Sequence, residues 1–401
     1  MKRTLLFLFL TVFLLASLSA CWNRREVTDL AIAVSLGIDK SDEGHFIVTV
    51  QVLNPNEVAA VEGGGGYDSP VTTYSASGEM LFEALRKLTK QVPRSIYLAH
   101  IRMIVFGEKY AREGIYDSLD FLSRDHEMRT DFYIVVAKDK SANEVLSTLT
   151  SIEKIPADKL LYSLESSSEN WAVSRKVQMN QLIDEILITG MDPVLTGITT
   201  LKESSKGDTF DNVQTVNPEV TLMYTGLAVF RQNQLIGWLT EDESKGFNYI
   251  KGDVQSTVVV TECGNGQAGI EMINMDSTIK TSVEGSKPAI FITIEGKGKL
   301  AEINCKLDVQ KPNTINELEK QTNKQIESDI RDVIFKAQKE FSSDFLGFGH
   351  QLYKDFPDEW KKYKGSWETE FAHVDVEVKS NIKVREVGSI SNPFLYENEE
   401  G

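Results

Sequence analysis

The chain has 401 residues, 43 Lys and Arg against 59 Asp and Glu, a formal net charge of -16, and 41% hydrophobic residues. These values are typical of a folded protein and exclude both wholesale disorder and a polytopic membrane protein. The acid excess also argues against a nucleic-acid partner, because it would repel phosphates. At roughly 150 residues per domain, the length predicts two or three domains.

The first 20 residues have the pattern of an export signal. Lys2 and Arg3 precede an apolar run at residues 5–18, which is shorter than the ~20 residues of a spanning helix. The run ends in Leu-Ser-Ala followed by Cys21, which resembles the bacterial lipoprotein signal. In that signal the Cys thiol receives a diacylglycerol and then becomes the new N-terminus. We predict a signal peptide at residues 1–20 and membrane attachment through Cys21; an uncleaved anchor is the alternative.

Residues 21–145 are predicted to form an N-terminal α/β domain. Apolar residues alternate at 30–38 and 46–52 around a turn, which predicts a β-hairpin. Periodicity and Gly or Pro punctuation predict the remaining elements: a flexible loop at 54–70, helices at 81–92 (capped by Ser77) and 109–122, and strands at 101–106 and 132–137.

Residues 146–252 are predicted to form a middle α/β domain, whose sheet the first strands of the chain are free to join. Leu182, Ile186 and Leu187 mark one face of a helix, and an extended run follows at 194–201. The polar stretch 202–218 is a linker or a long loop. Beyond it we expect a hairpin of strands 222–230 and 235–239, and then a short helix opened by a capping box of Thr240 and Glu243.

Residues 253–390 are predicted to form a C-terminal α/β domain, followed by a tail at 391–401. Strands are expected at 257–261, 269–275 and 289–294, and an amphipathic helix at 316–341. Strict alternation of apolar and polar residues at 374–384 predicts a final strand with one buried face. The aromatic residues of 341–371 favour core packing over a ligand-stacking groove. Strands, helices and hairpins mix throughout, so the predicted fold class is α+β.

The sequence contains no catalytic constellation that rises above chance. Gly264 to Gly269 match G-x-G-x-x-G, but β character continues after them, so we predict a hairpin turn and no bound dinucleotide. The five histidines are far apart, and no nucleophile elbow is present. Arg124-Asp125-His126-Glu127 is the densest polar cluster, for which a solvated loop after a helix is favoured over acid–base chemistry. We predict no enzyme activity, cofactor or metal.

Cys263 and Cys305 are the only thiols besides Cys21. Neither has a Cys or His nearby, so a zinc cluster has no local support. A disulfide between them is possible outside the cytoplasm. We expect two buried free cysteines instead.

Several segments carry a family resemblance. They are Cys21-Trp22-Asn23-Arg24-Arg25-Glu26, Phe82-Glu83-Ala84-Leu85-Arg86, Ile96-Tyr97-Leu98-Ala99-His100, Leu119 to Asp125, Gly226 to Phe230, and Gly237-Trp238-Leu239. In this order they resemble the spore germination receptor C-subunit lipoproteins, the Ger(x)C family. Asn23 departs from the Asp that this family often has, which leaves the lipidated Cys untouched.

The resemblance implies a non-enzymatic subunit of a nutrient germinant receptor. It implies a lipoprotein on the outer face of the spore inner membrane, beside two integral-membrane subunits, one of them permease-like. It further implies three α/β domains in a family-specific arrangement. The motif residues with an expected structural or partner-contact role are Trp22, Arg24, Arg25, Glu26, Arg124, Asp125, Gly237 and Trp238.

Two other functions fit parts of the pattern. A solute-binding lipoprotein of a membrane transport system would share the signal and the acidic body, but it would show two similar doubly wound lobes. A surface hydrolase would need a nucleophile or metal motif, and none is found in the sequence. Neighbouring genes for a permease-like protein or for a transport ATPase would separate the receptor from the transport system.

Overall fold

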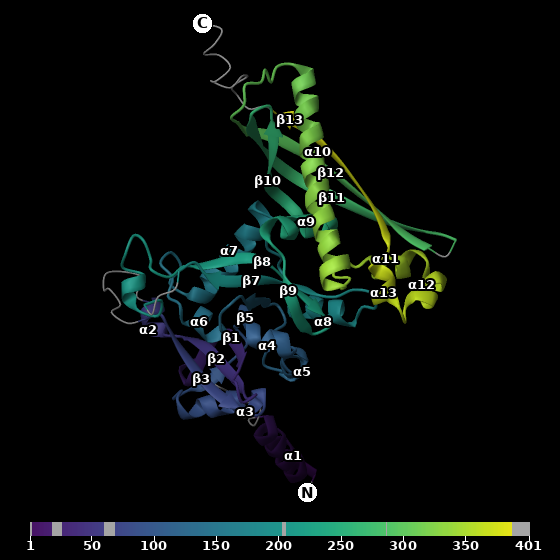
Figure 1. The fold of residues 1–401 in the computed structure, drawn as a ribbon. Helices are drawn as coiled ribbons and strands as arrows, with labels where there is room; N and C mark the ends of the chain where they lie inside the picture. Colours follow the sequence, from purple (N-terminus) through teal and green to yellow (C-terminus); the bar gives the residue numbers. More distant parts are fainter. Residues whose placement is uncertain (1, 18–25, 60–68, 203–205, 286, 387–401) are drawn as a thin grey trace.

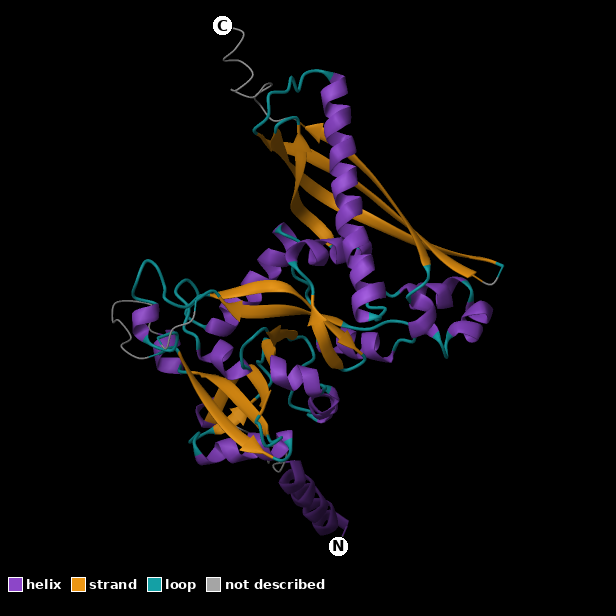
Figure 2. Cartoon of the chain, in the orientation of Figure 1, coloured by secondary structure: helices purple, strands orange, loops and turns teal. Residues whose placement is uncertain are grey.

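The computed structural model describes residues 2–17, 26–59, 69–202, 206–285 and 287–386. Two β-sheets, one of nine strands and one of four, organise the chain, and helices cover their faces (Figure 1, Figure 2). Parallel strands, antiparallel hairpins and helices occur together. The predicted α+β class is therefore confirmed, whereas the exact domain boundaries stay predictions.

The first sheet has the strand order β3-β2-β1-β5-β6-β7-β8-β9, and β4 pairs with the beginning of β1. Neighbours are parallel from β1 through β5 and β6 to β7, and antiparallel at both ends of the sheet. Both predicted hairpins are present. The strands are β1 (Leu30–Lys40), β2 (Phe46–Leu53), β3 (Val71–Gly78), β4 (Ser95–Tyr97), β5 (Met103–Gly107), β6 (Tyr133–Ala137), β7 (Val194–Thr200), β8 (Leu222–Arg231) and β9 (Gln234–Trp238).

This sheet continues across the boundary predicted at residue 145. β6 lies before that boundary and pairs with β7 beyond it, so the first strands share a sheet with those of the predicted middle domain. The polar stretch at 202–218 connects β7 to β8, which are antiparallel neighbours. It is therefore a long loop within one sheet. The short helix η4 (Phe210–Asn212) lies in it.

Helices cover both faces of the first sheet. Alternate residues of a strand point to opposite faces, so Ile104 and Phe106 of β5 join one core cluster while Met103 and Val105 join another. The first cluster includes α3 (Leu81–Lys87), α4 (Glu108–Glu113), α5 (Tyr116–Arg124) and α8 (Met179–Leu187). The second includes α6 (Ala142–Ser147) and α7 (Pro156–Asn170).

Two helix predictions in this region are wrong. The helix expected at 109–122 is two helices, α4 and α5, because Gly114 between them has a φ of 127° that only glycine adopts readily. Ser77 lies in β3 and caps no helix. The Glu83 side chain instead accepts the Glu79 N–H ahead of α3, at 2.8 Å.

Four further helices complete the N-terminal part, the first of them within the predicted signal peptide. They are α1 (Lys2–Ser17), η2 (Val27–Asp29), α2 (Pro55–Ala59) and η3 (Leu88–Lys90). α2 lies in the segment expected to be a loop. Among the residues that the structure describes, no helix combines the length and the apolar character needed to cross a membrane.

The second sheet has the order β10-β11-β12-β13, with the last pair parallel. Its strands are β10 (Val254–Cys263), β11 (Gly266–Glu284), β12 (Lys287–Ile303) and β13 (Asp375–Glu386). The predicted turn at Gly264 joins β10 to β11 as a hairpin. Its helices are α9 (Glu241–Lys251), α10 (Pro312–Phe335), the π-helix η5 (Lys336–Phe341), α11 (Phe348–Asp355), α12 (Pro357–Tyr363) and α13 (Trp367–Phe371).

The core of the second sheet confirms two further predictions. The capping box of Thr240 and Glu243 opens α9 as expected. Most of the late aromatic residues are buried against α10 and the sheet. These core residues include Phe345, Phe348, Trp360, Trp367 and Phe371.

The outer edge of β13 is closed by side chains of α10. The backbone N–H groups of Ser380, Ile382 and Val384 donate to Glu327, Asn323 and Glu319, at 3.1, 2.7 and 3.0 Å. The donors are alternate residues of a strand, and the acceptors are four residues apart on a helix, so both sets face each other along one line. An edge that would otherwise offer unpaired N–H groups to another chain is thereby blocked.

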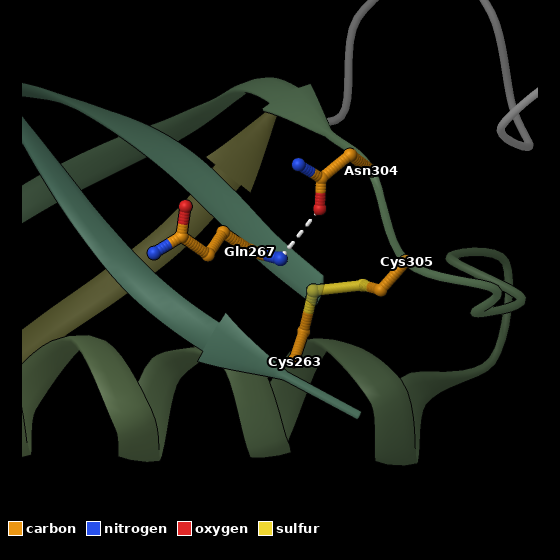
Figure 3. The surroundings of a disulfide bond; sticks show 4 residues. All are labelled: Cys263, Gln267, Asn304 and Cys305. Atoms are coloured by element: carbon orange, nitrogen blue, oxygen red, sulfur yellow. Dashed lines mark hydrogen bonds between the residues drawn. A yellow bond between two sulfur atoms is a disulfide. The ribbon is translucent and has the colours of Figure 1, made fainter. Parts of the chain in front are cut away.

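Cys263 and Cys305 form a disulfide, so the expectation of two free cysteines is wrong (Figure 3). Cys263 ends β10, and Cys305 follows β12 two strands away. The hairpin register brings them together because β11 pairs with β10 on one side and with β12 on the other. Hydrogen bonds between Gln267 and Asn304 fasten the same end of the sheet.

Replacing Cys305 by Ser should lower the free energy of unfolding by about 4 kcal/mol. The disulfide joins residues 42 positions apart and so restricts the conformations of the unfolded chain. Urea denaturation followed by circular dichroism measures the change. Dithiothreitol should lower the wild-type midpoint to a similar extent and leave the midpoint of a Cys263→Ser, Cys305→Ser double variant unmoved. Equal midpoints for oxidised and reduced wild type would contradict the expectation.

Candidate functional site

A cleft of about 680 Å³ lies between α3 and α5. Segments that are far apart in the sequence line it. They are β2 at Phe46, residues 79–89 around α3, residues 95–98 around β4, and α5 with the turn that follows it. Three of these segments overlap the resembling motifs Phe82 to Arg86, Ile96 to His100 and Leu119 to Asp125. The fold therefore brings together motifs that are separate in the chain.

The floor and one lip of the cleft are apolar. Leu81, Leu85 and Leu98 are buried beneath it. At the lip, Met80 is 68% exposed and Phe82 is 49% exposed. Large apolar side chains that stay in water beside a concave surface are typical of a binding site for another molecule.

The two helices are held in place by their buried faces. α3 buries Leu81, Ala84 and Leu85, while α5 buries Ser118, Leu119 and Leu122. Both helices end in basic residues, whose positive charge interacts favourably with the negative end of the helix dipole. Packing thus fixes one face of each helix. Leu81 and Leu85 on the buried face of α3 belong to the cleft floor, and exposed side chains such as Phe82 and Asp120 form its walls.

Ring contacts and ion pairs link the exposed side chains of the walls. The rings of Phe82 and Phe121 lie 6.4 Å apart between centroids, and the Arg86 guanidinium lies 4.7 Å from the Phe82 ring. Arg124 donates two hydrogen bonds to Asp120, each 2.8 Å long. The Arg124 guanidinium lowers the pKa of Asp120, so that carboxylate stays charged at neutral pH.

The rim of the cleft carries more acid than base. Its basic residues are Arg86 and Arg124, and its acidic residues are Glu79, Asp117, Asp120, Asp125 and Glu127. The acids lie mainly on α5 and on the turn after it. An apolar floor with an acidic rim favours an apolar segment or molecule whose own rim is neutral or basic.

The cleft includes two of the predicted site residues. Arg124 ends α5 and is exposed, and the Asp125 carboxylate accepts the Glu127 N–H at 2.9 Å, as expected of a solvated loop after a helix. Glu26 is exposed ahead of η2, away from the cleft lining. Cys21, Trp22, Arg24 and Arg25 lie outside the residues that the structure describes.

Gly237 and Trp238 lie in β9, apart from the cleft. A Cβ atom at Gly237 would lie 2.5 Å from the Phe341 ring, so only glycine fits against the end of η5. The Trp238 indole N–H donates to Glu108 at 3.2 Å, and the Lys138 ammonium lies 5.3 Å from the indole ring. These contacts hold the first sheet to α4 and to η5. The geometry supports a structural role for this pair.

Sequence reasoning missed part of the cleft lining. Phe46 was assigned only to a strand and Met80 to no element, and both line the cleft. A large apolar residue, Met80, directly before an amphipathic helix is the local signal that the sequence offers. Within the described ranges, no group of three or more His, Cys, Asp and Glu residues is placed to hold a metal ion.

Comparison with known proteins defines the class of this chain. Residues 23–200 match the spore germination protein N-terminal domain, and residues 225–388 match the C-terminal domain described as spore germination B3/GerAC like. Over 99% of both chains it is 31% identical to spore germination protein KC of Bacillus subtilis. Spore germination proteins B3 and A3 of Bacillus subtilis are 24% and 23% identical, covering 94% and 97% of this chain and 96% and 99% of their own.

The fold agrees with that of a solved relative. The crystal structure of the GerBC protein superposes with a TM-score of 0.56 over 87% of this chain and 96% of that chain, at 21% identity. This likeness shows a shared fold. Together with the full-length identity to spore germination protein KC, it places the chain in a defined class: the protein belongs to the GerAC-like, or Ger(x)C, family of spore germination proteins.

Proposed function

We propose that the protein is a non-enzymatic, lipid-anchored subunit of a spore nutrient germinant receptor, needed for receptor assembly and for the germination response. Diacylglycerol on Cys21 holds it on the outer face of the spore inner membrane. Its partners are two integral-membrane subunits, one of them permease-like. Similarity over the full length to spore germination proteins supports this role.

The observation that carries the proposal furthest is the cleft between α3 and α5. Three separate motifs of the family resemblance line it, and its exposed apolar lip at Met80 and Phe82 is suited to burial against another protein. Arg124 and Asp125 form part of its rim. We assign this cleft as a contact surface for a membrane subunit of the receptor.

The lipid anchor makes such a contact effective even when it is weak. A chain tethered to the same membrane as its partners meets them at a raised effective concentration. Two acyl chains are needed for a stable anchor, because one gives only marginal binding. The Cys21→Ala variant should therefore not be acylated and should be left uncleaved or be shed, and spores that carry it should lose the response to the receptor's nutrients.

A deletion strain tests the role directly. Its spores should lose germination with one set of nutrients, while vegetative growth and germination by agents that bypass nutrient receptors stay normal. Loss of optical density after nutrient addition measures the response. If the spores germinated normally with every nutrient but the cells failed to grow on one limiting solute, a solute-binding lipoprotein of a transport system would be the better assignment.

Phe82→Ala tests the cleft itself. Truncating an aromatic residue at the centre of a contact typically weakens binding by about 2 kcal/mol, or roughly 30-fold. The variant should fold, because Phe82 is half exposed, but should recover less of the membrane subunits in affinity purification from spore membranes. Tyr116→Ala is the matched control, since Tyr116 is 48% exposed on α5 and does not line the cleft. Equal recovery with both variants would remove the cleft from the assembly surface.

A further inference from the structure

A basic patch lies at the end of α3 and directly after it, on the surface of this acidic protein. It consists of Arg86, Lys90 and Arg94, all exposed. Lys90 and Arg94 have no ion-pair partner within the part of the chain that the structure describes. The nearby Glu83 is neutralised by Lys87, at 2.8 Å. Lys90 and Arg94 therefore supply positive charge that no carboxylate of the described residues neutralises, whereas Arg86 also belongs to the acidic rim of the cleft.

The sign of this patch is opposite to that of the chain as a whole. With a formal net charge of -16, most of the surface is repelled by an anionic layer such as phospholipid headgroups. A cationic patch on such a body is attracted to the same layer. The membrane attracts the patch and repels the acidic remainder of the surface. An anchored molecule would therefore turn until the patch faces the membrane.

The expected attachment point lies close to this patch. β1 begins at Leu30, nine residues after Cys21, and nine extended residues span at most about 30 Å. This is less than the length of α10, whose 24 residues extend about 36 Å. Leu30 pairs in parallel register with Ser95, the residue after Arg94. The start of the folded body and the patch are thus neighbours, whereas the loop before α10 lies at the far end of the molecule (Figure 1).

We propose that Arg86, Lys90 and Arg94 rest on anionic phospholipid headgroups and orient the anchored protein with α3 toward the membrane. Met80 and Phe82, at the beginning of α3, stay available in this orientation for the membrane subunit. This orientation holds the cleft between α3 and α5 at the height of the membrane surface, where segments of a membrane subunit emerge. The inference depends on the lipid anchor of the proposed function.

A fluorescent probe can report the orientation. Cys263 and Cys305 are joined and Cys21 is expected to be acylated, so a Cys introduced at Gln91 is the free thiol to label. Gln91 is exposed between Lys90 and Arg94. The full acylated protein is reconstituted into vesicles of phosphatidylcholine with about 30 mol% phosphatidylglycerol, which gives a clearly anionic surface. The lipid headgroups carry a quencher. A probe at Gln310, in the loop before α10, is the control.

Quenching at residue 91 should exceed that at residue 310 several-fold in the anionic vesicles. The difference should shrink in pure phosphatidylcholine, in high salt, and in a Lys90→Glu, Arg94→Glu double variant. The two changed residues are exposed, and circular dichroism checks that the variant folds. Equal quenching at both positions, or quenching that the charge reversal does not alter, would overturn the inference.

Flotation of the same samples separates this outcome from a failure of the anchor. If the wild-type protein floats with the vesicles while its probe at residue 91 stays unquenched, the orientation is wrong and the anchored subunit stands. If the wild-type protein does not float, the anchor at Cys21 is wrong and this inference falls with it. Cys21→Ala provides the unanchored reference.

Discussion

Replacing Asp344 by Asn should lower the free energy of unfolding by about 3 kcal/mol or more. The Asp344 carboxylate is buried after η5, where burial raises its pKa to about 6 and its hydrogen bonds counteract that rise. It therefore stays charged near neutral pH. Four donors surround it: the backbone N–H groups of Gly347, Phe348 and Gly349 and the indole N–H of Trp367, at 2.8, 3.0, 2.6 and 2.8 Å.

Asn has one oxygen in place of two, so its amide N–H₂ would face two of these donors. The hydrogen bonds lost are charge-assisted, and each is worth about 1.5–3 kcal/mol. Denaturation by urea, followed by circular dichroism, measures the loss. Asp332→Asn, at an exposed position of α10, is the matched control and should change stability by no more than about 0.5 kcal/mol. Similar midpoints for both variants would show that the carboxylate of Asp344 is dispensable.

The buried ion pair of Arg175 and Glu185 should be almost as sensitive. Both side chains are less than 10% exposed, and the guanidinium donates two hydrogen bonds to the carboxylate, at 3.0 and 2.5 Å. Arg175→Met removes the ion-pair partner of the buried Glu185 charge and leaves it only the Gln181 side-chain amide, at 3.3 Å. Loss of one partner of a buried ion pair costs about 3–5 kcal/mol. Replacing both residues by Met should restore most of the lost stability, because no isolated charge remains.

Arg124→Met provides the comparison at the surface. Arg124 and Asp120 make the same two-bond contact, but both side chains are more than half exposed. Exposed pairs contribute about 0–1 kcal/mol, so this variant should unfold at nearly the wild-type urea concentration. An equally small loss of stability in Arg175→Met and Arg124→Met would contradict this prediction. It would mean that water reaches the Glu185 carboxylate in the folded protein.

Elements with a strong period could be predicted from the sequence. The alternation at 374–384 corresponds to β13, and the capping box of Thr240 marks the start of α9. β3 was missed because its Thr72, Thr73 and Ser75 are half-exposed and give no clear apolar alternation. The disulfide was missed because Cys263 and Cys305 meet only through the register of β11 with both of its neighbours.

The candidate site was accessible to sequence reasoning only in part. Resemblance pointed to Arg124 and Asp125, which lie on the rim of the cleft. The place of Leu98 in the floor could not be predicted, because Leu98 directly follows β4, and the parallel pairing of β4 with the beginning of β1 joins segments that are far apart in the sequence. Spatial convergence of separate motifs is a property of the tertiary fold. The spacing of residues within each motif does not predict this convergence.

The closure of the β13 edge by α10 has a consequence for how the protein matures. An exported chain emerges N-terminus first, and 71 residues separate the end of β12 from the start of β13. Until Asp375 and the residues after it have crossed the membrane, β12 has an open edge and Glu319, Asn323 and Glu327 have no strand to cap. In the proposed lipid-anchored state, the chain then lies near other copies on the membrane with that edge exposed. A stop codon shortly before Asp375 should therefore yield aggregates on the membrane surface in place of a soluble remnant.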